Sequence, residues 1–314
     1  MEYINSYNIT ESQVKSVIQR HYPKWGAIAV NQLPRHPRSI LFEVSCLNAS
    51  PRVVKLYKNK TQEEVLKELS EYQIIYKELR KGGVPVSEVL HISQDSKELS
   101  VPYCVMTKLE GKQAKEVLNT KMGQSEFDEI IGKMGEVLFR IHQVESQRVG
   151  AFSRNISDSN IDWWKYLDSL LNSYQQNMTE SIQCQQTIQY LRNKLPQLNG
   201  LGRITLVHND FDFHNILVKQ TSGHWEVSGI LDFEWSFYGD GDWDIAWFYW
   251  SLRESYDNYY YLFNVFKSTY YNSNSSPVPS LDKIKAYILF RLLFLQTINP
   301  SFSMINYSKE VMGW

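Results

Sequence analysis

The sequence predicts an α+β protein with a small β-rich lobe followed by a larger, mainly helical lobe. Strand-like runs crowd its early part, helical spacing and aromatic residues dominate later, and a polar cluster beyond residue 200 lies between two strand-like runs. A chain of 314 residues is long enough for two lobes, each with its own core. We place the boundary between residues 108 and 109, which gives domains 1–108 and 109–314.

The first lobe is predicted to combine one leading helix with several strands. Residues 12–22 carry apolar side chains at helical spacing. Residues 39–44 and 52–57 are rich in β-branched and aromatic side chains, with the turn-forming run 48–51 between them. These two segments predict neighbouring strands, and residues 101–106 predict a further strand that leads into the connector between the lobes.

A longer helix is predicted after Thr61. Thr61 is a good N-cap, and Glu64 follows three residues later, as in a capping box. The apolar stripe of this helix consists of Val65, Leu69, Tyr72, Tyr76 and Leu79. The glycines at positions 82 and 83 end the helical pattern.

The second lobe is predicted to be helical around one β-hairpin. Apolar residues recur at helical spacing between Phe127 and Ile141, and the polar stretch 143–158 predicts a loop. The run 220–223 is a turn signal between two strands. The residues from Asp242 onward are rich in aromatic side chains, and we expect them to form helices.

Composition argues against several classes of protein. The net charge of −1 argues against a nucleic-acid partner, and 43% hydrophobic with 21% charged residues is ordinary for a soluble globular protein. The apolar run 287–295 is too short to cross a bilayer and contains Arg291. The three cysteines are widely spaced and the start of the chain lacks a secretion signal. We expect a cytoplasmic protein without a membrane partner, as a monomer or a homodimer.

The polar cluster predicts a phosphoryl-transfer centre. Asp210 and Asn215 follow one apolar strand-like run, and Asp232 follows another. Buried polar groups at strand ends are costly unless they bind something. Phosphoryl transfer requires one carboxylate that binds the acceptor hydroxyl. It also requires ligands for Mg²⁺, and an amide and a second carboxylate can supply them.

Lys55 is the predicted phosphate-binding residue of the first lobe. It interrupts an apolar strand, where a lysine needs a partner for its ammonium group. The following helix offers three carboxylates, Glu64, Glu68 and Glu71, and the sequence does not decide between them.

Together these residues resemble the motifs of a known family. His208-Asn209-Asp210, then Asn215, then Asp232-Phe233-Glu234, resembles the signature of the aminoglycoside phosphotransferase family, which includes choline, homoserine, methylthioribose and fructosamine kinases. The resemblance covers most of the chain, because further segments match in the family's order. These segments are Val53–Leu56, Gly83–Val86, Val105–Gly111, Tyr238–Asp240 and Asp244–Ala246.

The resemblance implies a protein-kinase-like two-lobe fold and Mg²⁺-dependent transfer from ATP, or GTP, to a hydroxyl of a small molecule. Asp210 is then the catalytic base, and Asn215 and Asp232 are the Mg²⁺ ligands. His208 braces the loop rather than reacting, and Asp244 braces the same loop from a later segment.

For the first lobe the resemblance implies a nucleotide site. Lys55 binds the phosphates, with Glu71 as its partner. Backbone groups from Thr107 to Leu109 meet the nucleotide base. The phosphate-covering loop falls on residues 33–39, which contain no glycine, so we expect backbone N–H groups near Ser39 to contact phosphate.

Two other functions compete with the kinase hypothesis. His208, Asp210, Asp212 and His214 alternate, so in an extended strand they would share one face, as the ligands of a metal-dependent hydrolase would. The glycine-free phosphate loop instead favours a non-catalytic kinase-like binding protein.

The acceptor is the least determined part of the prediction. An aminoglycoside is polycationic and needs acidic surface in the second lobe. The candidate carboxylates are Asp158, Asp162, Glu234, Asp240, Asp242, Glu254 and Asp257, and the basic residues that offset them are Arg253, Lys283, Lys285 and Arg291. An aminoglycoside-type antibiotic, and hence antibiotic resistance, is the leading hypothesis, with other hydroxylated metabolites as alternatives.

Overall fold

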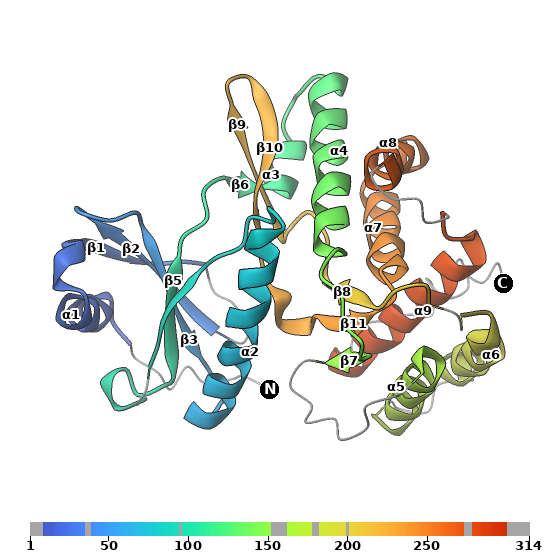
Figure 1. Ribbon diagram of the computed structural model, residues 1–314, viewed down its shortest axis with the longest axis horizontal. Helices are drawn as coiled ribbons and strands as arrows, with labels where there is room; N and C mark the ends of the chain where they lie inside the picture. The colour runs from blue at the N-terminus through green and yellow to red at the C-terminus, as the bar shows by residue number, and fades with distance from the viewer. Residues whose placement is uncertain are drawn as a thin grey trace. The chain divides into compact units, whose positions relative to one another are not determined.

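The computed structural model describes residues 9–34, 39–93, 96–151, 162–177, 182–198, 201–272 and 278–299. By its contacts the chain divides into two compact units: residues 1–81 with 85–110, and residues 82–84 with 111–314. The first unit holds an antiparallel sheet and the second is mainly helical (Figure 1). The predicted α+β class, with a sheet lobe and a helical lobe, is confirmed.

The sheet of the first unit has the strand order β1-β2-β3-β5-β4, with antiparallel neighbours throughout. Its strands are β1 (Ala27–Gln32), β2 (Ser39–Cys46), β3 (Arg52–Tyr57), β4 (Val89–Ile92) and β5 (Tyr103–Thr107). The helix α1 (Glu11–His21) packs on this sheet, and Val14, Val17 and Ile18 bury its apolar face against β-strand side chains. Single 3₁₀ turns follow at Pro23–Trp25 and Ser96–Glu98.

The helix α2 (Gln62–Lys81) begins with the predicted capping box. Thr61 N–H donates to Glu64 Oε2 at 2.7 Å, and Glu64 N–H donates to Thr61 Oγ1 at 3.2 Å. The predicted apolar stripe is correct except at one position. Ile75 is buried, whereas Tyr76 is only half-buried, because the buried face advances by three residues after Tyr72 rather than by four.

The second unit contains two small sheets. One has the order β10-β9-β6 and the other β7-β11-β8. Their strands are β6 (Lys112–Gln113), β7 (Gly150–Ala151), β8 (Thr205–Val207), β9 (Ile216–Thr221), β10 (His224–Ile230) and β11 (Phe237–Gly239). The predicted hairpin is β9–β10. The polar cluster lies between β8 and β9, where the chain passes from one small sheet to the other.

Helices make up the rest of the second unit (Figure 1). They are α3 (Ala114–Leu118), α4 (Gln124–Ile141), α5 (Trp163–Asn177), α6 (Ile182–Leu198), α7 (Asp242–Ser255), α8 (Tyr259–Asn272) and α9 (Leu281–Ile298). α4 and α8 pack closely at Gly135, where an added Cβ would lie 2.5 Å from Phe266 O. In the described part of the chain, no helix combines the length and the apolar character needed to cross a membrane.

The helix α9 is buried along most of its length, and its side chains from Ile284 to Leu293 are mainly apolar. Arg291 lies within this buried stretch, with 3% of its surface exposed. A buried arginine requires a counter-charge. Its partner belongs to the polar cluster between β8 and β9.

Candidate active site

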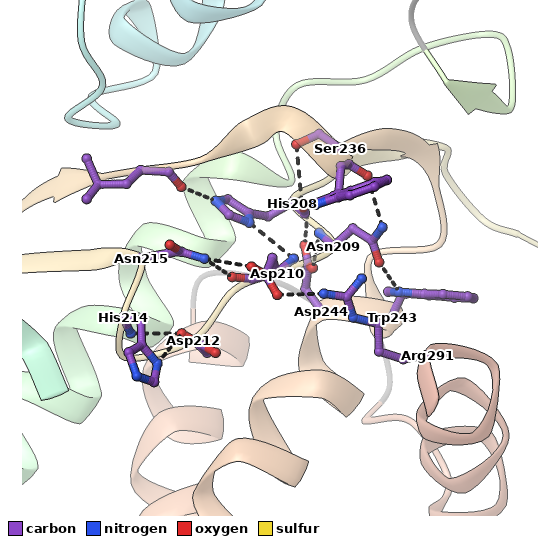
Figure 2. Close-up of polar contacts among 12 residues, drawn as sticks. His208, Asn209, Asp210, Asp212, His214, Asn215, Ser236, Trp243, Asp244 and Arg291 are labelled. Carbon is purple, nitrogen blue, oxygen red and sulfur yellow. Dashed lines mark hydrogen bonds and ion pairs between the residues drawn. The ribbon is translucent and has the colours of Figure 1, made fainter. Parts of the chain in front are cut away.

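Asp244, in the first turn of α7, holds the loop that follows β8 (Figure 2). Its Oδ2 accepts from His208 N–H at 2.7 Å, and its Oδ1 accepts from Asn209 N–H at 2.8 Å. The carboxylate is fully buried. Backbone hydrogen bonds to a buried charge are strong, so this side chain determines where the loop begins. The bracing contact expected of Asp244 is present.

Asp244 is itself supported from α4. His142 Nε2 lies 3.1 Å from Asp244 Oδ2, and His142 Nδ1 lies 2.7 Å from the Tyr270 hydroxyl. Burial raises the pKa of Tyr270, so the phenol keeps its proton. The arrangement that satisfies all three groups has Tyr270 donating to Nδ1 and Nε2–H donating to Asp244.

Asn209 turns the chain by adopting left-handed backbone geometry, with φ of 65°. Asparagine tolerates this conformation better than most residues. Its amide is bonded on both sides: Nδ2 donates to Trp235 O at 2.9 Å, and Oδ1 accepts from Trp243 Nε1 at 2.8 Å. These contacts hold the strained turn in place.

His208 is a bracing residue and uses both ring nitrogens to contact backbone. Nε2 lies 2.8 Å from Leu231 O, and Nδ1 accepts from Asp210 N–H at 3.3 Å. The hydrolase hypothesis is wrong in its premise, because the left-handed Asn209 and the turn after it prevent an extended strand. Among the residues that the structure describes, no group of three or more His, Cys, Asp and Glu side chains is arranged to hold a metal.

Asp210 is a partly exposed carboxylate whose two oxygens each accept a hydrogen bond from another side chain (Figure 2). Arg291 Nη2 donates to its Oδ1 at 2.6 Å, and Asn215 Nδ2 donates to its Oδ2 at 2.9 Å. The side chain retains 27% exposure. It is therefore oriented by fixed donors while a substrate can still reach it.

Asn215 and Asp232 lie beside each other because of the β9–β10 pairing. Leu231 N–H donates to Asn215 O at 2.8 Å, so Asp232 is the next residue along. Asn215 directs its amide nitrogen to Asp210 O and Oδ2, which leaves its oxygen as the group able to bind a cation. Asp232 has left-handed geometry, with φ of 61°. An amide oxygen and a carboxylate fit Mg²⁺ and leave coordination positions for phosphate oxygens and water.

Asp212 shapes the end of the loop. Its Oδ1 accepts from His214 N–H at 2.8 Å, and the His214 ring contacts the same atom through Nδ1 at 3.3 Å. His214 Nε2 lies 2.8 Å from Lys115 Nζ on α3. Burial, followed by the charge of Asp210, raises the pKa of Asp212. Asp212 and His214 are thus engaged with each other in a loop-closing turn.

In the first unit, Lys55 lies on β3 opposite Cys104 of β5. Burial raises the pKa of the Cys104 thiol to about 11, while the Lys55 ammonium lowers this pKa and the Glu68 carboxylate raises it. Both charges therefore lie close to the same thiol. Glu68 also pairs with Lys60, and its Oε1 is buried and makes no hydrogen bond within the described residues.

Glu71, the carboxylate chosen from the sequence, has different surroundings. Partial burial raises its pKa, and the charges that act on it are those of Lys67 and Glu68. Glu64 is occupied by the cap of α2. Glu68 thus acts on the same thiol as Lys55, whereas the charges that act on Glu71 come from its own helix.

The predicted phosphate loop lies partly outside the described residues, which omit residues 35–38. Ser39 begins β2 and is buried. At the hinge, Thr107 N–H donates to Glu88 O at 3.0 Å, so this donor is already used inside the unit. Leu109 N–H makes no hydrogen bond in the described part of the chain and remains available.

Two of the carboxylates expected to form an acidic surface in the second lobe, Asp240 and Asp242, are paired with one lysine. Lys283, on α9, lies 2.7 Å from Asp240 Oδ2 and 2.5 Å from Asp242 Oδ2. Tyr287 O–H donates to Asp240 Oδ2 at 2.5 Å. Burial raises the pKa of Asp242 to about 6, with a further contribution from Asp240. The candidate Asp158 lies outside the described residues.

Sequence reasoning missed two residues of this site, His142 and Arg291. His142 ends an ordinary amphipathic helix, and nothing in its neighbours marks it. Arg291 did carry a signal, since a single arginine within the apolar run 287–295 implies a buried counter-charge. The identity of that counter-charge, Asp210, follows only from the folded structure.

The fold is shared with solved kinases of antibiotics. A thermostable mutant of aminoglycoside phosphotransferase APH(4)-Ia matches with a TM-score of 0.69 and 15% identity over 95% of this chain and 97% of that one. Macrolide 2'-phosphotransferase MphH from Brachybacterium faecium matches with a TM-score of 0.63 and 11% identity over 95% and 97%. APH(2")-IIa, solved with streptomycin and ATP, matches with a TM-score of 0.63 and 17% identity over 97% of each chain. At these identities the similarity establishes the protein-kinase-like fold.

One curated relative matches at the level of sequence. Acyl-CoA dehydrogenase family member 10 of Mus musculus is 31% identical over 173 residues, or 55% of this chain. The match covers only 16% of that protein's length.

The family is established by a model that covers most of the chain. The model of the phosphotransferase enzyme family (APH) matches residues 42–262, which include Lys55, the loop with Asp210 and Asn215, and Asp232. The resemblance noted in the sequence is thereby confirmed. The chain belongs to the phosphotransferase enzyme family.

Proposed function

We propose that this protein is a small-molecule kinase that transfers the γ-phosphoryl group of ATP or GTP to a substrate hydroxyl. The acceptor is an aminoglycoside-type antibiotic or a similar hydroxylated metabolite. The observation that carries the proposal is the geometry of Asp210. This partly exposed carboxylate accepts hydrogen bonds from Arg291 and Asn215, and Asn215 is paired through its backbone with Leu231, the residue before Asp232.

Each polar residue of the second unit then has a role. Asp210 orients the acceptor hydroxyl and accepts its proton at a carboxylate oxygen. Asn215 and Asp232 hold Mg²⁺, which neutralises charge on the transferred phosphoryl group when it is bound. Asp244 and His208 keep the loop rigid, so that Asp210 does not have to be ordered during the reaction.

The first unit supplies the nucleotide-binding groups, as in the proposed domains 1–108 and 109–314. Lys55 binds the phosphates with Glu68 as its partner, in place of Glu71. Leu109 N–H contacts the nucleotide base, whereas Thr107 supports the strand end. The Ser39 backbone lies at the end of the phosphate loop. We further propose that the protein is cytoplasmic, has no nucleic-acid or membrane partner, and is a monomer or a homodimer.

The direct test is release of nucleoside diphosphate by the purified protein. Mg·ATP and Mg·GTP are supplied separately with a panel of aminoglycosides, macrolides, choline, homoserine and sugars. Release that depends on one acceptor supports the kinase and names its acceptor class. A protein whose melting temperature does not respond to Mg²⁺ and nucleotide would instead be a non-catalytic relative.

The choice between the two helix carboxylates is tested by a matched pair of variants. Glu68→Gln should raise the KM for nucleotide about tenfold or more, since it removes the carboxylate charge that this proposal assigns to Lys55. Glu71→Gln makes the same chemical change one turn away and should leave that KM within about twofold. The reverse order in steady-state kinetics would restore Glu71 as the partner.

A further inference from the structure

Arg291 is a fixed cation in contact with the proposed base. Its Nη2 donates to Asp210 Oδ1 at 2.6 Å, and its side chain is 4% exposed (Figure 2). The Cζ atom lies 5.0 Å from the ring centroids of both Trp247 and Phe294. The guanidinium group therefore lies against two aromatic rings, where cation–π attraction favours it.

The only ion pair that Arg291 makes within the described residues is with Asp210. Its Nε and Nη1 atoms are buried and make no hydrogen bond in the same part of the chain. Moving this guanidinium away from Asp210 would leave a buried charge without a counter-charge, which is strongly unfavourable. The pair is therefore a permanent feature of the site rather than one of several rotamers.

This pairing determines what charge an acceptor meets. A hydroxyl that gives its proton to Asp210 must come within about 3 Å of the carboxylate. Any group flanking that hydroxyl then lies close to the guanidinium as well as to Asp210. The negative charge that would attract an ammonium group is offset by a positive charge that cannot withdraw.

Two further carboxylates, at the start of α7 and just before it, are offset in the same way. Asp240 and Asp242 share Lys283, which lies two turns before Arg291 on the same helix. The helix α9 thus delivers a cation to Asp210, Asp240 and Asp242. Asp162 is exposed and pairs with Lys165.

We propose that Arg291 is a specificity-determining residue that favours acceptors with no cationic group beside the phosphorylated hydroxyl. The inference rests on the proposed kinase function and on Asp210 as the base. Of the two acceptor classes in the proposed function, it favours the hydroxylated metabolite, neutral or anionic beside the reacting hydroxyl, and it predicts that amine-rich aminoglycosides are the poorer acceptors.

The test uses pairs of acceptors in which one member is cationic and the other neutral, and the choline pair is isosteric. The pairs are kanamycin with its fully N-acetylated form, glucosamine with N-acetylglucosamine, and choline with its neutral carbon isostere 3,3-dimethylbutan-1-ol. Diphosphate release gives kcat/KM, and calorimetry with Mg·ADP gives binding. For each pair that reacts or binds, the neutral member should have a kcat/KM or an affinity about tenfold or more above that of the cationic member.

Three variants of the full chain separate selectivity from structure. Arg291→Met keeps a long apolar side chain between Trp247 and Phe294, and should shift the preference toward cationic acceptors about tenfold, through the acceptor KM rather than the nucleotide KM. Arg291→Lys retains the charge and should retain the preference. Lys285→Met removes a charge from the same helix at a residue that makes no ion pair within the described part of the chain, and should leave the preference unchanged.

Three results would overturn the inference. One is a wild-type preference for the cationic member of the pairs. Another is an unchanged preference in an Arg291→Met protein that still unfolds cooperatively. Both results leave the kinase function intact. The third is the absence of both binding and diphosphate release with every pair and with the wider panel, which would contradict the proposed function itself.

Discussion

Asp210→Asn should lower the turnover number by about 10²–10⁴-fold, the usual contribution of a general base. The amide has nearly the shape of the carboxylate and can still accept from Arg291. It cannot take a proton from an acceptor hydroxyl at neutral pH. Nucleotide binding should change little, because Asp210 does not belong to the proposed nucleotide-binding groups.

The same substitution should also destabilise the protein, by about 1–3 kcal/mol, since Arg291 stays buried without a full counter-charge. Activity is therefore measured well below the midpoint of thermal unfolding, after a circular-dichroism melt of each variant. Asp282→Asn, an equivalent change at an exposed carboxylate of α9, is the matched control and should keep full activity. An Asp210→Asn enzyme with wild-type turnover would remove Asp210 from the role of base.

Asp244→Ala should cost about 3–5 kcal/mol of folding free energy, the largest loss of stability expected from a single change at this site. The fully buried carboxylate accepts from two backbone N–H groups and contacts His142. Alanine leaves all three donors buried without an acceptor. Because the loop then loses its anchor, turnover should fall even in the fraction that remains folded.

Urea denaturation at pH 7 measures this loss, with Asp168→Ala as its control. Asp168 is a partly exposed carboxylate that pairs with Arg192, and its removal should cost less than about 1 kcal/mol. A midpoint for Asp244→Ala close to that of Asp168→Ala would show that the loop is held by other contacts. Asp244→Asn should fall between the two, since the amide oxygen replaces one of the two acceptors.

Local chemistry was enough to predict much of the fold. The cap at Thr61, the strands on either side of residues 48–51 and the hairpin turn at 220–223 each depend on residues close together in the chain, and each is present. The periodicity of α2 failed only at Tyr76. There the choice between a step of three and a step of four depends on what the helix packs against, and neighbours in sequence do not determine that.

In the candidate site, too, features that depend on residue order could be predicted, and features that depend on packing could not. The motif of Asp210, Asn215 and Asp232, and the bracing by Asp244, were predicted from residue types in a given order. The partner of Lys55 stays a prediction, because three glutamates on one helix differ only in the direction that each side chain takes from that helix. The hydrolase hypothesis lost its premise because the left-handed Asn209 and the turn after it remove the extended geometry on which alternation depends.

The sequence by itself thus determined the family, the class of fold and the residues that carry the proposed chemistry. The tertiary structure alone decided which charges meet. Arg291 is separated from Asp210 by eighty-one positions, and Lys283 from Asp242 by forty-one, so no local pattern reports either pair. The physical reason is that burial makes an unpaired charge intolerable without specifying its partner, and only the packing of α9 against the loop and α7 supplies the partner.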